Sequence, residues 1–496
     1  MPVMKPLPAA LYTAQQVRDL DRSAIDELGI PGYELMTRAG HAALNALKAL
    51  WPAARSISVM CGPGNNGGDG YVIARVAQAQ GLRTSVVALA DPKALQGDAR
   101  LAFEEFAAAG GRCEPWSPHA LDADVIVDAI FGTGLTREVA GIAADVIGAI
   151  NVSRRPVLAV DIPSGLHADS GAVLGVAVRA NVTVTFIGRK LGFYLGHGQD
   201  LTGHLVFDDL GVPQETYHGM PSAAELIEES IVATALPRRS RAAHKGLHGH
   251  VLVIGGGPGM PGAARLAGEA ALRAGAGLVT VATHPSNLGA LAGRPELMCV
   301  GAAGPADLAA ALERATVLAL GPGLGQSPWA REMHAHALAA GKPTIVDADA
   351  LNLLAGSNLR RDDWVLTPHP GEAARLLDVT TAKIQQDRLT AATSLQRRYG
   401  GTAVLKGPGT IVQAKDCAPA LCDRGNPGMA VAGMGDVLTG VIAGIAAQCG
   451  DLGLAARAGV FVHAQAGDLA ARNGERGMLA GDVLERVRAC VNPACS

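Results

Sequence analysis

Residues 425–440 read GNPGMAVAGMGDVLTG, an apolar glycine-rich turn that runs directly into a predicted helix. The turn places Asp436 at the start of the apolar run VLTGVIAGIAA. The first amides of a helix are unpaired and carry partial positive charge, and glycines let a phosphate or a developing anion approach them closely. Asp436 stands beside that anion as an acid or a base. The segment therefore predicts a site for group transfer.

The same segment resembles the anion hole of the ribokinase-like superfamily. In that superfamily the matching aspartate acts on a substrate hydroxyl, and ATP supplies the phosphate. The resemblance makes a kinase the first hypothesis, which the other motifs of the chain must support or overturn.

The composition is typical of packed α/β domains with many turns. The chain has 496 residues, more than one hydrophobic core usually organises, so we expect two domains. Glycine accounts for 63 residues, while charged residues make up only 18%, which argues against disorder, a fibre or a disulfide scaffold. The net charge is −3 and no Lys/Arg block occurs, so we expect no nucleic-acid partner.

The chain carries no pattern for export or for membrane insertion. The N-terminal residues lack a charged start followed by an apolar region, and no apolar run reaches the roughly 18 residues of a membrane span. We expect a cytoplasmic protein that forms a homo-oligomer, because fused α/β domains of this kind often assemble. Eight cysteines without a CxxC pair or a Cys/His cluster favour reduced, mostly buried thiols over disulfides or a zinc site.

Short β-branched runs that end in glycine alternate with helical periodicity through the first half. Examples are SISVMCG at 56–62, DVIVDAIFGTG at 124–134 and PVLAVDIPSG at 156–165. Such βαβ units predict a parallel, doubly wound, Rossmann-like sheet. Ligands of these sheets bind beyond the carboxyl ends of the strands, where the glycine turns lie.

This pattern lapses at 216–232, a stretch without sustained apolar period that we interpret as a linker. A second α/β series begins with GHVLVIGGGPG at 249–259 and continues to the opening segment. We predict an N-terminal domain over 1–215, the linker over 216–232 and a C-terminal domain over 233–496. The two halves share no repeated motif, so they are not an internal duplication.

The turn GPGNNGGDG at 62–70 is the first candidate binding site. It follows a strand and precedes a helix, but it is neither a P-loop nor a GxGxxG motif. We expect its glycines to permit unusual dihedral angles and close backbone approach. A purely structural loop is the alternative, but the side-chain oxygens of Asn65, Asn66 and Asp69 favour a cation or a hydroxyl-rich ligand.

Two aspartates end neighbouring strands of the same half. Asp128 ends DVIVDAI, and Asp161 follows VLAV with Ser164 three residues later. Carboxylates at such positions are costly to desolvate unless they are paired or bind a metal, although each alone is also a common helix cap. With Asn66 and Ser164 they form an all-oxygen set that suits a hard cation.

The motifs GPGNNGGDGYVIAR, DAIFGTGLTREV and AVDIPSGLHADSG resemble those of the YjeF N-terminal domain, the NAD(P)HX epimerase family, across residues 12–215. The resemblance implies that Asn66, Asp128 and Ser164 bind potassium and that Asp161 lies at the reactive end of hydrated NADH or NADPH. It implies that the nucleotide is held by Asn65, Asn66, Gly67, Gly68, Asp69, Gly132, Thr133, Gly134, Leu135, Thr136, Arg137, Glu138 and Asp161. Epimerisation at C6 requires ring electrons to expel hydroxide and readmit it from either face, so we assign Asp161 the acid/base role.

Motifs of the second half also lie at predicted strand ends. Lys406 in LKGPGT offers a point charge for phosphates, Gly407 and Gly409 permit backbone approach, and Thr410 offers a hydroxyl. His369 lies between two prolines in TPHPGE, which fixes it rigidly and favours ligand contact over a structural role. His463 lies in an apolar helix and is expected in the core.

LGPGLG at 320–325, LTPHPGEAARLL at 366–377, LKGPGT at 405–410 and the Asp436 segment resemble, in this order, the ADP/ATP-dependent NAD(P)HX dehydratases. That family is a divergent branch of the ribokinase-like fold, and the resemblance covers residues 235–490. It implies that hydrated NAD(P)H contacts Ala263, Gly323, His369 and Asp436. It implies that ADP, with Mg²⁺, is held by Lys406, Gly407, Pro408, Gly409, Thr410 and Gly435.

Two features of this half leave alternatives open. Asp347 and Asp349 also follow a strand, and they either bind magnesium, shape the pocket or cap a helix. The residues before Gly435 read AVAG, where many relatives place a hydroxyl residue, so we expect altered phosphate contacts with Asp436 retained.

The leading hypothesis is a bifunctional metabolite-repair enzyme that acts on NADHX and NADPHX. The resemblance favours ADP in chains of bacterial type and ATP in eukaryotic ones, and we choose ADP. The second hypothesis is a small-molecule hydroxyl kinase fused to a binding domain. An epimerase-like half has no obvious use in such a kinase, which argues against this hypothesis. The third is a scaffold or RNA-associated module. The first half still contains the residues of its candidate site, which argues against a loss of that site: Asn66, Asp128, Asp161 and Ser164.

Overall fold

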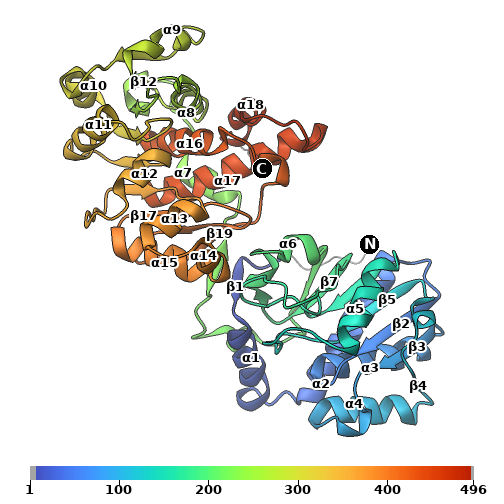
Figure 1. The fold of residues 1–496 in the computed structure, drawn as a ribbon. Coiled ribbons are helices and arrows are strands. Elements are labelled where there is room, and N and C mark those ends of the chain that lie inside the picture. Colours follow the sequence, from blue (N-terminus) through green and yellow to red (C-terminus); the bar gives the residue numbers. More distant parts are fainter. Residues whose placement is uncertain (1–6, 493–496) are drawn as a thin grey trace. The chain divides into compact units, whose positions relative to one another are not determined.

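Figure 1 shows a computed structural model of the chain, which describes residues 7–492. The chain divides between Ala224 and Glu225 into two compact units. Each unit contains a largely parallel sheet with helices on its faces, which confirms the predicted α/β class.

The sheet of the first unit has seven parallel strands. Its order reverses between β2 and β5, which are neighbours in the sheet, and such a switch point is where doubly wound sheets bind ligands. Across the sheet the strands are β4 (Cys113–Glu114), β3 (Arg83–Ala88), β2 (Ser56–Cys61), β5 (Val125–Ala129), β6 (Val157–Val160), β7 (Val182–Phe186) and β9 (His204–Asp208).

Helices cover both faces of this sheet. On one face α3 packs against α2 and α4, over a core that includes Val59, Val72 and Phe106. On the other face α5 contributes Val146 and Ile147 to a second cluster. The helices are α1 (Ala14–Arg22), α2 (Gly32–Leu50), α3 (Asn65–Ala79), α4 (Gly97–Ala108), α5 (Ile142–Val152) and α6 (Gly198–Leu201).

A short strand pair attaches the N-terminal helix to this unit. β1 (Ala10–Tyr12) runs parallel to β8 (Arg189–Lys190), with Tyr12 opposite Lys190. Thr13 caps α1, accepting a hydrogen bond from the amide of Gln16, whose side chain in turn accepts one from the amide of Thr13. The pairing therefore fixes where α1 begins, next to the segment that follows β7.

The sheet of the second unit is parallel over seven strands and continues through an antiparallel meander. Its order also reverses, between β11 and β14. The parallel strands are β13 (Met298–Gly301), β12 (Leu278–Thr283), β11 (His250–Ile254), β14 (Val317–Leu320), β15 (Thr344–Val346), β16 (Trp364–Leu366) and β17 (Thr402–Leu405), and β18 (Thr410–Gln413), β19 (Ala420–Cys422) and β10 (Ala224–Leu226) follow.

The helix that begins at the opening segment lies at the centre of the second unit. α16 (Met434–Cys449) packs so closely against α8 that a Cβ on Gly440 would lie 2.1 Å from the carbonyl oxygen of Ala267. The other helices are α7 (Ser230–Ala235), α8 (Pro261–Arg273), α9 (Leu288–Leu291), α10 (Ala309–Arg314), α11 (Pro328–Ala339), α12 (Ala348–Leu354), α13 (Pro370–Leu377), α14 (Thr381–Gln386), α15 (Arg388–Tyr399), α17 (Leu452–Ala470) and α18 (Ala480–Cys490).

The stretch interpreted as a linker, 216–232, carries secondary structure. It contains β10 and the start of α7, and Glu225 and Leu226 pair with β19 of the second unit. A three-residue strand is too short to show an apolar period, which is why the sequence pattern missed it. The division at Ala224 falls inside the predicted linker.

Within residues 7–492 no helix is both long and apolar enough to cross a bilayer. The seven cysteines in that range are free, as predicted. The prediction that they are mostly buried is confirmed in part, because three are buried and two are half-buried: Cys61, Cys422 and Cys490, and Cys113 and Cys449. Cys299 in the edge strand β13 and Cys417 in the loop after β18 are exposed. Cys495 lies outside the described residues.

Candidate active sites

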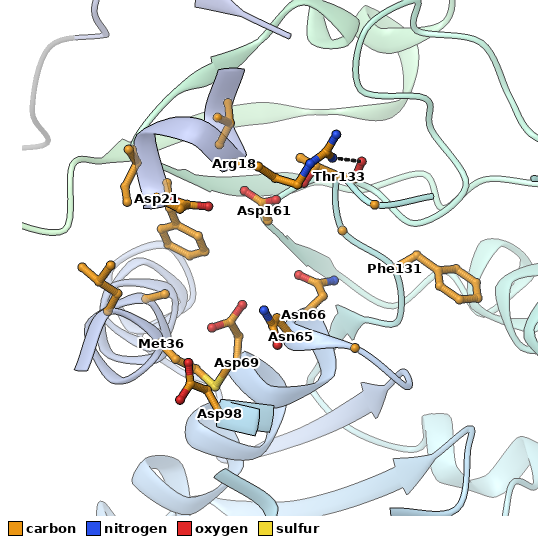
Figure 2. Close-up of a pocket in the computed structure, with 18 of the residues that line it drawn as sticks. Arg18, Asp21, Met36, Asn65, Asn66, Asp69, Asp98, Phe131, Thr133 and Asp161 are labelled. Atoms are coloured by element: carbon orange, nitrogen blue, oxygen red, sulfur yellow. Dashed lines mark hydrogen bonds between the residues drawn. The ribbon is translucent and has the colours of Figure 1, made fainter. Parts of the chain in front are cut away.

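A cavity of about 720 Å³ opens at the carboxyl ends of β2, β5 and β6, at the switch point of the first sheet (Figure 2). Three predicted segments line it: the 63–66 turn with Asp69, the 130–137 loop and Asp161. Gly67, Gly68 and Glu138 are not among its lining residues. The parallel topology therefore brings motifs together that are about a hundred residues apart in the chain.

The glycines of the 62–70 turn are needed for close approach and not for unusual dihedral angles. None of its five glycines has a positive φ angle, so that part of the expectation is wrong. A Cβ on Gly62 would lie 1.7 Å from the carbonyl oxygen of Ile130, and one on Gly67 would lie 2.1 Å from that of Gly62. At Gly64 nothing lies within 4 Å. The turn is thus packed against the loop after β5.

Asp128 and Ser164 are in direct contact beneath the cavity. The Ser164 hydroxyl donates to Asp128 Oδ1 at 2.6 Å, and the Ser164 amide donates to Oδ2 at 2.8 Å. Both residues are fully buried, and burial raises the pKa of Asp128 to about 6 even though these hydrogen bonds lower it. Asn66 is buried as well, and its amide oxygen and nitrogen have no hydrogen-bond partner in the described part of the chain.

Asp161 adopts a left-handed backbone conformation, with a φ of 68°, directly after β6. This strained geometry is uncommon for a non-glycine residue and is a frequent feature of functional sites. Its carboxylate forms an ion pair with Lys190, whose side chain is fully buried. Lys190 also donates to the hydroxyl of Thr185 at 2.7 Å. The buried ammonium compensates the charge of Asp161.

Two further carboxyl groups line the same cavity. Asp21 lies on α1, and burial raises its pKa to about 6, with Lys190 lowering it and Asp161 raising it. Asp69 lies on α3, and burial raises its pKa well above the usual range, with the charges of Asp161 and Asp21 adding to the effect. Figure 2 shows Asp21, Asp69 and Asp161 around one space.

The second candidate site assembles at the carboxyl ends of β11, β14, β15, β16 and β17. Ala263 at the start of α8 and Gly323 after β14 are adjacent, because a Cβ on Gly323 would lie 3.0 Å from that of Ala263. Gly323 has a φ of 59°, so glycine relieves backbone strain there. These two predicted contacts of the substrate thus come together from separate strand ends.

Lys406 connects three elements of this site. Its ammonium lies 2.7 Å from Asp347 Oδ1, and the Thr439 hydroxyl of α16 donates to Asp347 Oδ2 at 2.7 Å. A Cβ on Gly435 would lie 3.3 Å from the Lys406 ammonium, so this charge faces the start of α16. Asp347 makes no cap bond and instead accepts hydrogen bonds from Lys406 and Thr439, so the capping alternative is wrong.

Asp436 lies in the first turn of α16, as predicted. Burial raises its pKa to about 7, the negative charge of Asp347 adds to this shift, and Lys406 opposes it. A carboxyl that ionises near neutral pH is suited to accept a proton from a hydroxyl. The partly positive N-terminus of α16 lies at the same place.

His369 caps α13 with its own ring. Its Nδ1 accepts hydrogen bonds from the amides of Gly371 and Glu372, and the Glu372 carboxylate accepts one from the His369 amide at 2.8 Å. Burial and Lys406 lower the pKa of His369, so the ring is neutral. Half of the His369 side chain is exposed, and its Nε2 stays available except for a 3.5 Å approach to Glu372.

The turn 405–410 is supported from behind by a residue that sequence analysis missed. Arg388 at the start of α15 is buried and donates to the carbonyl oxygens of Leu405, Lys406 and Gly409. Gly407 and Gly409 both have positive φ angles, 137° and 64°. The Thr410 hydroxyl donates to the carbonyl oxygen of Gly407 at 2.9 Å, so it stabilises the turn.

The structure places Asp349, which the sequence left open, and His463, which was expected in the core. The Asp349 carboxylate accepts a hydrogen bond from the Gly325 amide at 2.8 Å and so holds the turn after β14. His463 is buried in α17, as expected, and burial lowers its pKa to about 4. Both residues therefore support the site from within the fold.

The comparisons with known proteins match both units. The family model described as YjeF-related protein N-terminus matches residues 32–192, and that described as NAD(P)H-hydrate dehydratase matches residues 251–488. The bifunctional NAD(P)H-hydrate repair enzyme of Coxiella burnetii is 48% identical over 486 residues, which cover 97% of this chain and 99% of the relative. This chain belongs to that repair-enzyme family. The family member of Escherichia coli is 45% identical over 493 residues, covering 98% and 95%.

Solved structures agree with the ribokinase-like part of this repair-enzyme fold. A ribokinase-like superfamily protein of Enterococcus faecalis is 30% identical and covers 54% of this chain and 96% of its own, with a TM-score of 0.50. A protein of Streptococcus mutans is 29% identical and covers 54% and 98%, with a TM-score of 0.51. The predicted ribokinase-like architecture is confirmed.

The sequence analysis of this repair-enzyme family member did not assign four charged residues to the candidate sites: Asp21, Lys190, Glu372 and Arg388. Lys190 follows the strand VTVTF, so a cation beside a strand end was a usable signal. For Asp21 the sequence carries no such signal, because a lone aspartate on an amphipathic helix usually faces solvent. Its place in the cavity follows from the pairing of β1 with β8.

Proposed function

We propose that this chain repairs hydrated NADH and NADPH in two reactions. The first unit interconverts the R and S epimers of NADHX and NADPHX, and the second unit dehydrates the S epimer with ADP. The observation that carries the proposal is the occurrence of two separate carboxyl sites in one chain. Asp161 lies in the cavity at the first switch point, and Asp436 lies at the N-terminus of α16.

In the first unit, Asn65, Asn66, Asp69, the loop 132–138 and Asp161 bind the hydrated nucleotide. Asp161 is the acid/base at C6, and Lys190 keeps it charged and positioned. Asn66, Asp128 and Ser164 fit a potassium ion, because all three offer oxygen ligands and the buried Asn66 oxygen has no protein partner among residues 7–492. Such an ion would neutralise charge beneath the turn.

In the second unit, Ala263, Gly323, His369 and Asp436 bind the nicotinamide end of the substrate. Asp436 removes the proton from the C6 hydroxyl, whose oxygen then attacks the terminal phosphorus of ADP and releases AMP. The phosphate then leaves C6, a proton leaves C5, and the dihydronicotinamide ring is restored. Phosphorylation thus converts a poor leaving group into a good one.

ADP binds to the turn 406–410 and to Gly435. The Lys406 charge beside Gly435 and the amides at the start of α16 stabilise the phosphoryl group during its transfer. We propose ADP over ATP as the phosphoryl donor. Mg²⁺ is expected to bind together with the phosphates of ADP, as is usual for this ion. That the chain is cytoplasmic and forms a homo-oligomer stays a prediction.

The proposal is tested by supplying a mixture of R- and S-NADHX with ADP and following the absorbance of NADH. Recovery of the whole pool supports both reactions. If only the S fraction returns, the epimerase assignment fails, and if nothing returns with ADP or ATP, the dehydratase assignment fails. Accumulation of a stable phosphorylated product would instead favour a small-molecule kinase.

A further inference from the structure

The cavity of the first unit presents two carboxyl groups from opposite sides. Asp161 follows β6, whereas Asp69 lies on α3, and both line the cavity. In Figure 2 Asp161 lies above the open space and Asp69 lies below it. The two carboxyl groups therefore face one cavity from different elements.

The two carboxyl groups differ in their partners. Asp161 is paired with the fully buried ammonium of Lys190, which suits the role of a base. Within residues 7–492, Asp69 forms neither a hydrogen bond nor an ion pair through its carboxyl group, and its pKa is raised well above the usual range by burial and by Asp161 and Asp21. One side of the cavity thus holds a base and the other holds an acid.

The reaction proposed for this unit needs such a pair. Inversion at C6 requires hydroxide to leave one face of the ring and water to enter the other. The departing oxygen must receive a proton, and the entering water must lose one, so one acid and one base on opposite faces serve one turnover. This requirement rests on the proposed epimerase function.

We infer that Asp69 is the second catalytic residue of the epimerase site, donating a proton on one face of the ring while Asp161 accepts one on the other. As the C6–O bond breaks, the lone pair of ring N1 forms a C6=N1 double bond, and the Asp69 proton leaves with the oxygen as water. A second water adds to C6 from the opposite face, its proton passes to Asp161, and the electron pair returns to N1.

The net transfer of a proton gives this mechanism a direction. One water leaves and one enters, and one proton has moved from Asp69 to Asp161. The resulting state, with Asp69 ionised and Asp161 protonated, is the one that converts the opposite epimer. Proton exchange with water restores the starting state. The other charged groups that line the cavity are Arg18, Asp21, Asp98 and Arg137, and Lys190 pairs with Asp161. Asp161 and Asp21 raise the pKa of Asp69, and Lys190 lowers it.

The test compares Asp69→Asn with the wild-type chain in water enriched in oxygen-18. Asparagine keeps the shape of the carboxyl but cannot transfer its proton, so we expect the epimerisation kcat to fall by about 10²-fold or more with little change in KM. The wild-type product should carry one solvent oxygen at C6 per inversion. Asp19→Asn, on the surface of α1, is the matched control and should keep the wild-type rate.

The dehydration activity of the same samples reports the amount of folded chain. The pH profile adds a second readout, because wild-type epimerisation should fall as pH rises through the raised pKa of Asp69, and the residual activity of Asp69→Asn should lack this limb. A rate above a tenth of the wild-type value in Asp69→Asn overturns the inference. So does retention of the original C6 oxygen, which would indicate opening of the ring at the N1–C6 bond.

The same experiment separates this inference from the function on which it rests. If the wild-type chain does not epimerise at all, the proposed function fails. If the wild type is active, Asp161→Asn is inactive and Asp69→Asn is fully active, only the pairing of the two aspartates fails.

Discussion

Asp161 and Asp436 are both aspartates at the end of a secondary-structure element, but their surroundings differ. Asp161 contacts one fully buried ammonium, that of Lys190. Asp436 is buried near the negative charge of Asp347, and the Lys406 ammonium that could compensate it is already paired with Asp347. The pKa of Asp436 therefore rises to about 7. The role as a base that we propose for Asp436 depends on that value.

The first prediction concerns the pH dependence of dehydration. A base must be ionised, so kcat/KM for S-NADHX should rise as pH increases through about 7, the pKa of Asp436. The measurement is the initial rate at low substrate between pH 5 and pH 9. Glu372, whose pKa burial also raises to about 7, is tested in parallel as Glu372→Gln. A profile that is flat across neutral pH in the wild type would contradict the assignment.

The second prediction concerns stability. The pKa of Asp436 is higher in the folded state than its ordinary 3.8, so ionisation opposes folding and stability falls as pH rises from about 4 to about 7. Asp436→Asn removes this charge. Calorimetry should show a higher melting temperature for the variant above pH 7, with the difference vanishing towards pH 4. A lower melting temperature at pH 8 would mean that the Asp436 charge stabilises the fold.

At the scale of elements, strand ends and helix starts are joined by a few buried polar contacts. Asp347 after β15 joins Lys406 after β17 to Thr439 in α16. In the first unit, Gly62 lets the start of α3 approach the loop after β5. Both contacts hold a helix N-terminus against the carboxyl edge of its sheet, where the candidate sites lie.

The third prediction follows from the Lys406–Asp347 pair. Asp347→Asn leaves the largely buried Lys406 ammonium with only the more distant carboxylate of Glu372, at 3.9 Å. Removal of one partner from a buried pair typically costs about 3–5 kcal/mol. Hydrogen exchange of the amides in β15, β16 and β17 should reveal a drop of this order in the opening free energy. Asp362→Asn is the matched control, since its pair with Lys415 is exposed and should contribute nothing measurable. Equal effects of the two variants would refute the prediction.

The fourth prediction compares two glycines of one turn. A Cβ at Gly62 would meet the carbonyl oxygen of Ile130 at 1.7 Å, so Gly62→Ala should force the backbone apart and destabilise the first unit by about 1–3 kcal/mol or more. Gly64→Ala meets no atom within 4 Å and should cost at most about 1 kcal/mol as a helix cap. Thermal unfolding and epimerisation rates of both variants provide the measurement. A Gly64→Ala variant that is as damaged as Gly62→Ala would show that the contact with Ile130 is not the cause.

At the scale of the whole molecule, two α/β units each carry their own site. Each site lies at the switch point or carboxyl edge of its own sheet, and each is built from residues of one unit. The chemistry links them, because the proposed epimerase produces the epimer that the proposed dehydratase consumes. The fused chain thus contains one proposed dehydratase site for each proposed epimerase site.

The fifth prediction tests the independence of the two sites. Asp436→Asn should abolish dehydration and leave epimerisation unchanged, whereas Asp161→Ala should do the reverse. The first is measured as NADH recovery from pure S-NADHX, and the second as loss of optical purity in the absence of ADP. If either variant lost both activities while remaining folded, the two sites would not be independent.

Most of the fold follows from local patterns. The runs SISVMCG and PVLAVDIPSG indicate strands followed by turns, and in a parallel sheet the carboxyl ends of all strands lie at one edge. Asn66, Asp161, His369 and Asp436 could therefore be assigned to sites without coordinates. The short strand β10 could not be predicted, because three residues carry no measurable period.

The sequence by itself determined two α/β units and the strand-end motifs of the two candidate sites, because both depend on residues close together in the chain. Only the tertiary structure decided which charges meet. Lys190 is 29 residues from Asp161, and Lys406 is 59 residues from Asp347. Asp21 reaches the cavity from the N-terminal helix. Burial and neighbours in space decide such differences, so the contrast between Asp161, which is paired with Lys190, and Asp69, whose pKa is raised, exists only in the folded chain.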